Sequence, residues 1–152
     1  SFEENISFSD LSSLDHEREK FNEFYLELLN GFKLEGKSSK YDVDKLNEII
    51  YFYTHDALIH FSSPHGLEQS SGAAWGTRDV CQGPIEFFTC TNNYKIIKEV
   101  LLELFSHQFI ENGEFPQWFM FDKYNMQQDD SHGDIIFWPL KALSEYCFEY
   151  WR

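Results

Sequence analysis

The sequence predicts an all-α fold. Apolar residues recur at helical spacing in several long segments, polar or glycine-rich connections separate these segments, and no segment shows the alternation of a convincing strand. The chain has 152 residues, the size of one ordinary domain, and contains no internal repeat. We therefore treat residues 1–152 as part of one helical domain without an internal boundary.

Two helices are predicted in the first half of the chain. Residues 1–12 are polar and indicate a loop, and residues 13–32 follow with an apolar stripe that Gly31 ends. After a polar connection, residues 43–61 carry a second stripe of this kind. The apolar positions are Phe21, Phe24, Tyr25, Leu28, Leu29 and Phe32 in the first helix, and Leu46, Ile49, Ile50, Tyr53 and Ala57 in the second.

Three more helices are predicted in the second half. They span residues 79–90, residues 94–109, and a last segment that starts near Asp134 or Ile135. Pro84 is tolerated because it stands near the beginning of the first of them. Residues 110–133 have no helical period, and their aromatic stretch FPQWFMF is compatible with an extended segment or a packed loop.

A glycine-rich break separates the second and third predicted helices, with the sequence PHGLEQSSGAAWGTRDVCQGPIEFF. Glycine allows sharp turns and lets a ligand approach the backbone closely. Within this break, Trp75 offers a flat apolar face, Arg78 a rigid fork of donors and Asp79 an acceptor carboxylate. A sugar ring has an apolar face and paired hydroxyls, so these three side chains suit a carbohydrate. The alternative is a structural loop in which Arg78 and Asp79 form a local ion pair.

The charge of the chain limits its partners. It has 12 Lys and Arg against 26 Asp and Glu, a net charge of −14, which argues against binding to nucleic acid or to an anionic membrane. A phosphate site would need local arginines and helix N-termini. No histidine or cysteine spacing matches a metal site, so no metal is expected. The 3 cysteines are expected to be free thiols in a reducing compartment, which indicates a cytoplasmic protein.

Three blocks in the second half of the chain resemble the inverting glycoside phosphorylases, the group typified by cellobiose phosphorylase. The GxRD-x-x-Q segment of that family is similar to GAAWGTRDVCQGPIEFF, its hQ...G...W stretch to SHQFIENGEFPQW, and its SDDxLWLPxAxxxY block to SHGDIIFWPLKALSEY. The blocks follow the order of the family, and their wording is closest to the branch that acts on β-1,3-oligoglucans. The first half of the chain matches only weakly.

This resemblance implies that the chain is part of an (α/α)6 barrel catalytic domain. Such a barrel has more helices than this sequence predicts, so we expect residues 1–152 to be a fragment of a larger enzyme. The expected partners are an oligosaccharide and phosphate. The oligomeric state is open, with a homodimer as one option for the full-length enzyme.

The resemblance also implies roles for individual residues. Asp134 matches the second Asp of the SDD motif, the general acid that protonates the glycosidic oxygen. Arg78 and Asp79 match the Arg–Asp pair that grips the donor glucose. Further candidates for substrate binding are Trp75, Gln82 and Trp118.

Several alternatives stay open from the residues alone. Gly133 stands where the family has the first Asp of its motif, and Asp129 and Asp130 just upstream are interpreted as a solvated loop. Asp134 could serve only as a helix N-cap. Burial among aromatic neighbours would favour its protonated form, whereas a helix N-terminus would favour the carboxylate. Trp118 is equally consistent with packing in the core.

The implied activity is phosphorolysis of a β-glucan with inversion. Inorganic phosphate is the co-substrate, with no other cofactor, and it attacks C1 of the terminal glucose while Asp134 protonates the leaving oxygen. The products are α-glucose 1-phosphate and a shortened oligosaccharide. A second hypothesis is an inverting hydrolase on the same barrel, which would need a carboxylate base to activate water. A third is a catalytically silent carbohydrate-binding segment.

Overall fold

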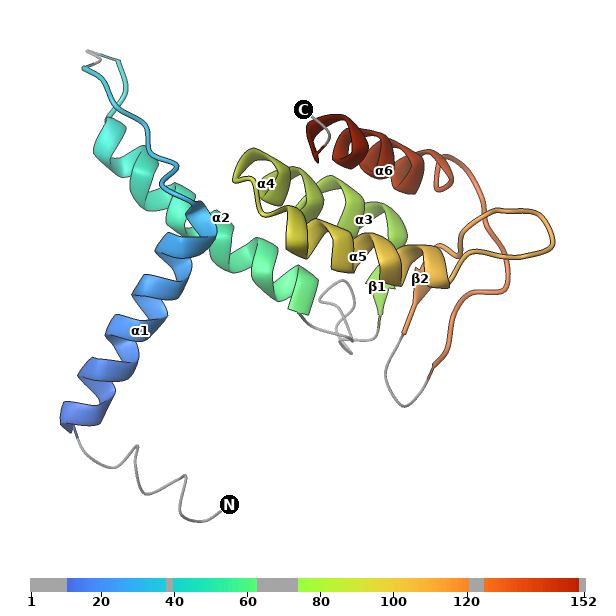
Figure 1. The fold of residues 1–152 in the computed structure, drawn as a ribbon, viewed down its shortest axis with the longest axis horizontal. Coiled ribbons are helices and arrows are strands. Elements are labelled where there is room, and N and C mark those ends of the chain that lie inside the picture. Colours follow the sequence, from blue (N-terminus) through green and yellow to red (C-terminus); the bar gives the residue numbers. More distant parts are fainter. Residues whose placement is uncertain (1–10, 38–39, 63–73, 121–124, 151–152) are drawn as a thin grey trace.

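The computed structural model of the chain describes residues 11–37, 40–62, 74–120 and 125–150. These residues are mostly helical, which confirms the predicted all-α class (Figure 1). Most of the predicted loop at residues 1–12, and Gly66 and Gly72 of the glycine-rich break, lie outside the described residues. The elements are α1 (Leu11–Leu29), α2 (Val43–Ser62), β1 (Trp75–Gly76), α3 (Thr77–Gln82), α4 (Pro84–Cys90), α5 (Tyr94–Ser106), β2 (Trp118–Phe119) and α6 (Phe137–Tyr150).

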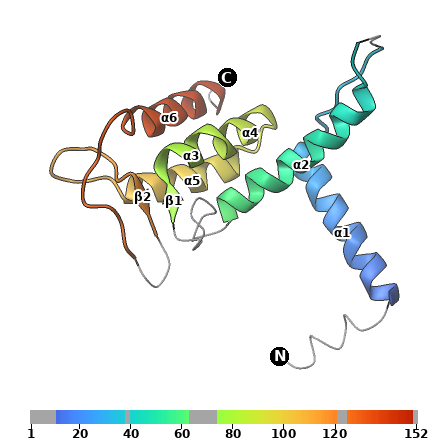
Figure 2. The same ribbon diagram turned by 180° about the vertical axis from the view of Figure 1, so that it is seen from behind.

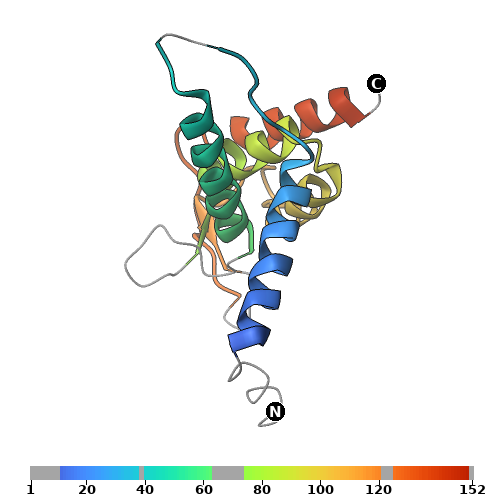
Figure 3. The same ribbon diagram turned by 90° about the vertical axis from the view of Figure 1, so that its left-hand side faces the viewer.

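Helices α3, α4, α5 and α6 pack together, and α1 and α2 form a V that projects from this group (Figure 1). The view from behind shows the same division (Figure 2), and in the side view α1 and α2 lie in front of the other helices (Figure 3). Helix α2 joins the two parts because it contacts both α1 and α4. Within the described residues the helices do not close into a ring, so the (α/α)6 barrel stays a prediction. No helix in these same residues has the length and apolar character needed to cross a membrane.

The two N-terminal helices form as predicted, but they bury only part of their apolar stripes. Tyr25, Leu28 and Leu29 of α1 and Ala57 of α2 are buried. The stripe positions that remain exposed are Phe21, Phe24, Phe32, Leu46, Ile49 and Tyr53. Helix α1 ends before Gly31, whose φ of 74° lies in the left-handed region that favours glycine. The sequence therefore predicted where this helix ends. It did not predict which apolar side chains are buried, because that depends on which face of each helix another helix contacts.

The single helix predicted at residues 79–90 is instead two helices, α3 and α4, which meet at Gly83. The N–H of Gly83 donates to the backbone oxygen of Asp79 at 3.2 Å, and this bond closes α3. Pro84 has no N–H with which to continue the helical ladder, so a new helix begins there. A proline in the first turn of a helix removes no intrahelical hydrogen bond, which explains why α4 accepts it.

The hydrophobic core lies between α3, α4, α5 and α6. Helix α5 buries one face and exposes the other, which matches its predicted apolar stripe. It ends at Ser106, before the predicted boundary at residue 109. The large side chains that are fully buried include Val80, Ile85, Phe88, Ile97, Val100, Leu104, Phe115 and Phe119.

The aromatic stretch after α5 contributes a short strand to the fold. Strands β1 and β2 pair antiparallel, with Trp75 opposite Phe119 and Gly76 opposite Trp118. This confirms the extended option for part of the FPQWFMF stretch, although residues 121–124 lie outside the described residues. The sequence signal for the partner strand was too short to see, because β1 has only 2 residues.

Thr77 ties the start of α3 to the segment that leads into β2. Its N–H donates to the backbone oxygen of Gln117 at 3.0 Å, and its hydroxyl donates to the backbone oxygen of Pro116 at 2.5 Å. Thr77 is 0% exposed, so water cannot replace the second bond. A buried hydrogen bond of this kind fixes the position of the helix and contributes to the stability of the fold.

Helix α6 begins at Phe137, later than the predicted start near Asp134 or Ile135. Residues 133–136 form a turn, in which the N–H of Phe137 donates to the backbone oxygen of Asp134 at 3.0 Å. Pro139 and Ala142 are buried and hold α6 against the core. Asp134 therefore stands in the turn before α6.

We predict that Thr77→Val lowers the free energy of unfolding by about 1–3 kcal/mol, because the buried oxygen of Pro116 loses its donor. Urea unfolding followed by tryptophan fluorescence measures this change. The matched control is Thr89→Val, since the Thr89 hydroxyl only adds a 2.8 Å bond to the backbone oxygen of Ile85 inside α4. We expect the control to change stability by about 0.5 kcal/mol or less. Equal losses in the two variants would contradict this account of Thr77.

Candidate active site

Arg78 is presented by the first turn of α3. The residues around it, Thr77, Val80 and Cys81, are buried and set the orientation of the helix. Arg78 and Asp79 consequently lie on the outer face of α3, and both are exposed. The short helix thus has one face in the core and one face available to a ligand.

Asp134 is presented by the turn before α6. Gly133 starts this turn with a φ of 67°, a conformation that side-chain-bearing residues rarely adopt. A Cβ at Gly133 would meet nothing within 4 Å, so backbone conformation alone favours glycine there. Ile135 is buried at 3% exposure and fastens the turn to the core, while the neighbouring Asp134 is exposed. This accounts for the glycine that replaces the first Asp of the SDD motif.

The two side chains meet directly. Arg78 Nη1 lies 3.2 Å from Asp134 Oδ1, and the side chains are 44% and 51% exposed. The indole Nε1 of Trp138 donates a hydrogen bond of 3.0 Å to the other carboxylate oxygen, Oδ2. The packing of α3 against α6 brings these residues together from distant parts of the sequence. Exposed ion pairs contribute only about 0–1 kcal/mol, so the Arg78–Asp134 contact can break at small cost.

This geometry answers two of the alternatives that the sequence left open. Arg78 pairs with Asp134 rather than with the adjacent Asp79, so the local ion pair expected of a structural loop is not the one observed. Of the two surroundings considered for Asp134, burial among aromatic side chains is not the one observed, because its side chain is half exposed and the nearby Phe137 is 67% exposed. Asp129 and Asp130 are both exposed, as expected of a solvated loop.

The remaining predicted site residues lie in different surroundings. Trp75 is 3% exposed and packs against Phe61 and Phe119, so its ring has no open face for stacking on a sugar. Burial beside β2 is the physical reason for this correction. Gln82 lines a separate cavity of about 370 Å³ between α2 and α4. Trp118 is half-buried in β2 opposite Gly76, and this strand pairing brings it close in space to the start of α3.

Comparison with known proteins gives one informative similarity. No protein-family model matches the chain. A 1,2-beta-oligoglucan phosphorylase from Listeria innocua is 54% identical to this chain over 123 residues. The match covers 80% of this chain and 11% of the length of that relative. This similarity supports the resemblance to glycoside phosphorylases, but the relative is named for β-1,2 linkages, whereas the sequence blocks indicated the β-1,3 branch.

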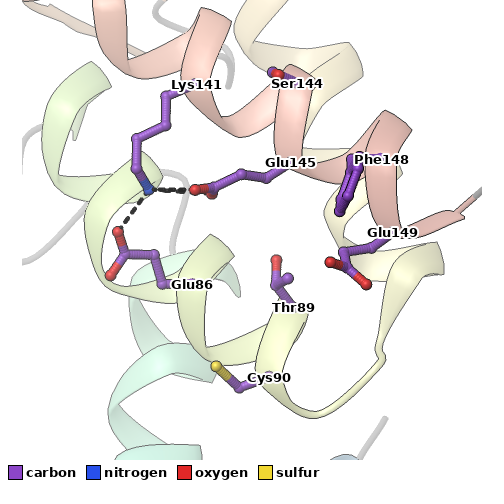
Figure 4. Close-up of a pocket in the computed structure, with 8 residues that line it drawn as sticks. All are labelled: Glu86, Thr89, Cys90, Lys141, Ser144, Glu145, Phe148 and Glu149. Carbon is purple, nitrogen blue, oxygen red and sulfur yellow. Dashed lines mark hydrogen bonds and ion pairs between the residues drawn. The ribbon is translucent and has the colours of Figure 1, made fainter.

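A second cavity, of about 440 Å³, opens between α4 and α6 (Figure 4). Lys141 Nζ reaches across it to Glu86 on α4 at 2.9 Å and also contacts Glu145 on its own helix at 3.0 Å. The hydrogen bond that Lys141 donates to Glu86 raises the pKa of Lys141, and Glu145 adds to this rise against the opposing effect of burial. Glu149 also lines the cavity, so carboxylates outnumber the amine and disfavour an anion such as phosphate.

Sequence reasoning missed Trp138 as a residue of the candidate site. The detectable signal was its spacing, because residues four apart at the start of a helix often interact. This spacing is informative only if Asp134 is known to stand in a turn from which its side chain points back toward α6. In the described ranges, no group of three or more His, Cys, Asp or Glu side chains is arranged to hold a metal ion.

Cys81 is predicted to resist thiol reagents in the folded protein. Burial raises the pKa of its thiol to about 12, with Lys141 opposing and Asp79 adding to the rise. At pH 8 the reactive thiolate is then a fraction on the order of 10⁻⁴. Titration with a chromogenic disulfide at pH 8 should modify the exposed Cys90 and Cys147 and leave Cys81 until a denaturant is added. Rapid modification of Cys81 in the folded protein would contradict its burial.

Proposed function

We propose that this chain is a segment of a glycoside phosphorylase that acts on β-oligoglucans. The observation that carries the proposal is the 54% identity to the Listeria phosphorylase over 80% of the chain. The contact between Arg78 and Asp134 supports it, because the resemblance assigns these two residues to sugar binding and proton delivery, and they lie side by side. An exposed carboxyl group next to a guanidinium suits a reaction at a sugar ring.

In the proposed reaction, an oxygen of inorganic phosphate forms a bond to C1 of the terminal glucose. The bond between C1 and the glycosidic oxygen breaks, its electron pair stays with that oxygen, and the proton of Asp134 moves to it. The products are α-glucose 1-phosphate and an oligosaccharide that is one glucose shorter. Phosphate is already an anionic nucleophile, so this reaction needs no carboxylate base to activate it.

The proposed reaction requires Arg78 to change partners. Asp134 has to carry a proton before it can donate one, and a protonated carboxyl group forms no ion pair with Arg78. Arg78 and Asp79 are both exposed on α3 and present paired donors and acceptors to sugar hydroxyls. Binding of the terminal glucose would therefore draw Arg78 away from Asp134, at the small cost expected for an exposed ion pair.

For the linkage, we propose β-1,2-oligoglucans as the preferred substrate. The name of the relative supports this choice, and the β-1,3 linkage indicated by the sequence blocks is the competing one. Sugar linkage is set by the subsites that hold the acceptor, so the donor residues Arg78 and Asp79 suit either linkage.

We predict that the full-length protein containing this chain converts β-1,2-glucotriose to α-glucose 1-phosphate only when phosphate is present. The measurement is an enzymatic assay for glucose 1-phosphate on β-1,2-, β-1,3- and β-1,4-linked oligomers, each with and without phosphate. Release of free glucose without phosphate would instead support a hydrolase. Preference for the β-1,3-linked oligomer would support the proposed phosphorylase activity but overturn the proposed β-1,2 linkage.

Replacement of the proposed acid should remove turnover while sugar binding survives. We expect Asp134→Asn to lower kcat on the oligosaccharide by about 10²–10⁴-fold, the usual contribution of a positioned proton donor. The matched control is Asp130→Asn, which alters an exposed carboxylate of the preceding loop that contacts Gln128. Unchanged kcat in Asp134→Asn would contradict the role of this residue, and equal losses in both variants would indicate a general effect on the loop.

A further inference from the structure

The cavity between α4 and α6 combines an aromatic ring with polar groups (Figure 4). Phe148 is 58% exposed, so a ligand can reach its ring. Sites for small molecules have volumes of about 300–1,000 Å³ and join apolar surface with a few polar groups. The cavity, of about 440 Å³, therefore has the size and the mixture of groups of a ligand site. Its lining consists of Glu86, Thr89, Cys90, Lys141, Ser144, Glu145, Phe148 and Glu149.

The polar groups of this cavity suit a ligand with several hydroxyl groups. Lys141 Nζ donates to Glu86 and Glu145, which engages two of the three hydrogens of the ammonium group. A carboxylate accepts at about four lone-pair positions, so both glutamates can accept from a ligand while they hold Lys141. The hydroxyl of Thr89 donates to the backbone oxygen of Ile85, and its oxygen can still accept. Hydroxyl groups both donate and accept, so they match this set of partners.

The charge of the cavity favours a neutral ligand. The carboxylates of Glu86, Glu145 and Glu149 surround the single ammonium of Lys141, so the ionised groups carry a formal charge of −2. This charge repels an anion. A cationic ligand is the competing possibility, but Lys141 already occupies the position between Glu86 and Glu145 that such a cation would take. A neutral molecule with hydroxyl groups and an apolar face fits the remaining space best.

The cavity and the candidate active site lie along the same line of contact between helices. Arg78 contacts Asp134 where α3 meets the start of α6, and Glu86 contacts Lys141 where α4 meets α6. Helices α3 and α4 follow one another beside α6 (Figure 1). From the start of α6 to Phe148 the helix advances by about 16 Å. The cavity is therefore separate from the candidate active site, and a long oligosaccharide can extend from one to the other.

We propose that the cavity between α4 and α6 is an accessory binding site for a β-oligoglucan. A sugar ring stacks its apolar face on Phe148, and its hydroxyls bind Glu86, Glu145 and Ser144. This inference rests on the proposed function for the choice of ligand. No bond forms or breaks in the cavity. A chain that is held at two sites binds more tightly than at either site alone, so the cavity would favour long oligosaccharides.

The test is protection of Cys90 from alkylation by iodoacetamide in the full-length protein, without phosphate so that no phosphorolysis occurs. Cys90 and Cys147 are both exposed, but only Cys90 lines the cavity. With β-1,2-glucohexaose at about ten times its Kd, alkylation of Cys90 should slow about 5-fold or more, because most of the sites are then occupied. Cys147 is the internal control, and its rate should stay unchanged. Mass spectrometry of the digested protein measures both rates.

Two variants connect the protection to this cavity. Phe148→Ser removes the stacking surface, and the hexaose should then no longer slow alkylation of Cys90. Cys90 also lines the cavity between α2 and α4, which Phe148 does not line, so this variant distinguishes the two cavities. The matched control is Leu140→Ser, which replaces another exposed apolar side chain of α6 outside the cavity and should retain the protection. Both positions are exposed, so both variants are expected to fold.

Four results would overturn the accessory site. The first is unchanged alkylation of Cys90 with the hexaose, and the second is equal protection in the parent protein and Phe148→Ser. The third is protection by spermidine but not by the hexaose, which would indicate a cationic ligand. The fourth is alkylation of Cys90 in the free protein as slow as that of buried Cys81, because the cavity would then be closed.

The proposed function is judged by a different measurement, the formation of α-glucose 1-phosphate when phosphate is added. Absence of this product from a protein whose Cys90 is protected would overturn the proposed function and support the accessory site. Formation of the product without protection of Cys90 would overturn the accessory site alone.

Discussion

The buried face of α3 is the constraint on which the candidate site depends. Thr77 joins the start of this helix to the segment before β2 through hydrogen bonds to Gln117 and Pro116, and Val80 and Cys81 occupy the core. Because this face of α3 is buried, Arg78 has to lie at the surface. Burial of an apolar side chain contributes about 1.5–3 kcal/mol, against about 0–1 kcal/mol for an exposed ion pair. Helix packing therefore places Arg78 and Asp134, and their contact follows from it.

The weakness of that contact is useful in the proposed reaction. An arginine buried with a carboxylate would be costly to separate from it, whereas an exposed one can turn to sugar hydroxyls. Trp138 differs from Arg78 because its ring is partly buried and packs against the core. The carboxylate of Asp134 thus accepts from an exposed donor at Oδ1 and from a partly buried donor at Oδ2.

The strong negative charge of the chain shapes the proposed binding of phosphate. With a net charge of −14, the overall field repels an anion, and the cavity between α4 and α6 is lined by more carboxylates than amines. Lys141 in that cavity is already engaged by Glu86 and Glu145. A phosphate next to Asp134 would therefore need cationic groups or helix N-termini close to it, in addition to the Arg78 that the proposal assigns to the sugar hydroxyls.

The sequence by itself determined the helical class, most helix positions, the end of α1 just before Gly31 and the resemblance of three motif blocks to glycoside phosphorylases, because these depend on local periodicity, backbone preference and residue order. It could not determine which part of each stripe is buried, the break of α3 from α4, the β1–β2 pairing, or the burial of Trp75. Those features depend on which segments meet in space. The Arg78–Asp134–Trp138 arrangement is of the same kind: only the packing of α3 against α6 brings the three side chains together.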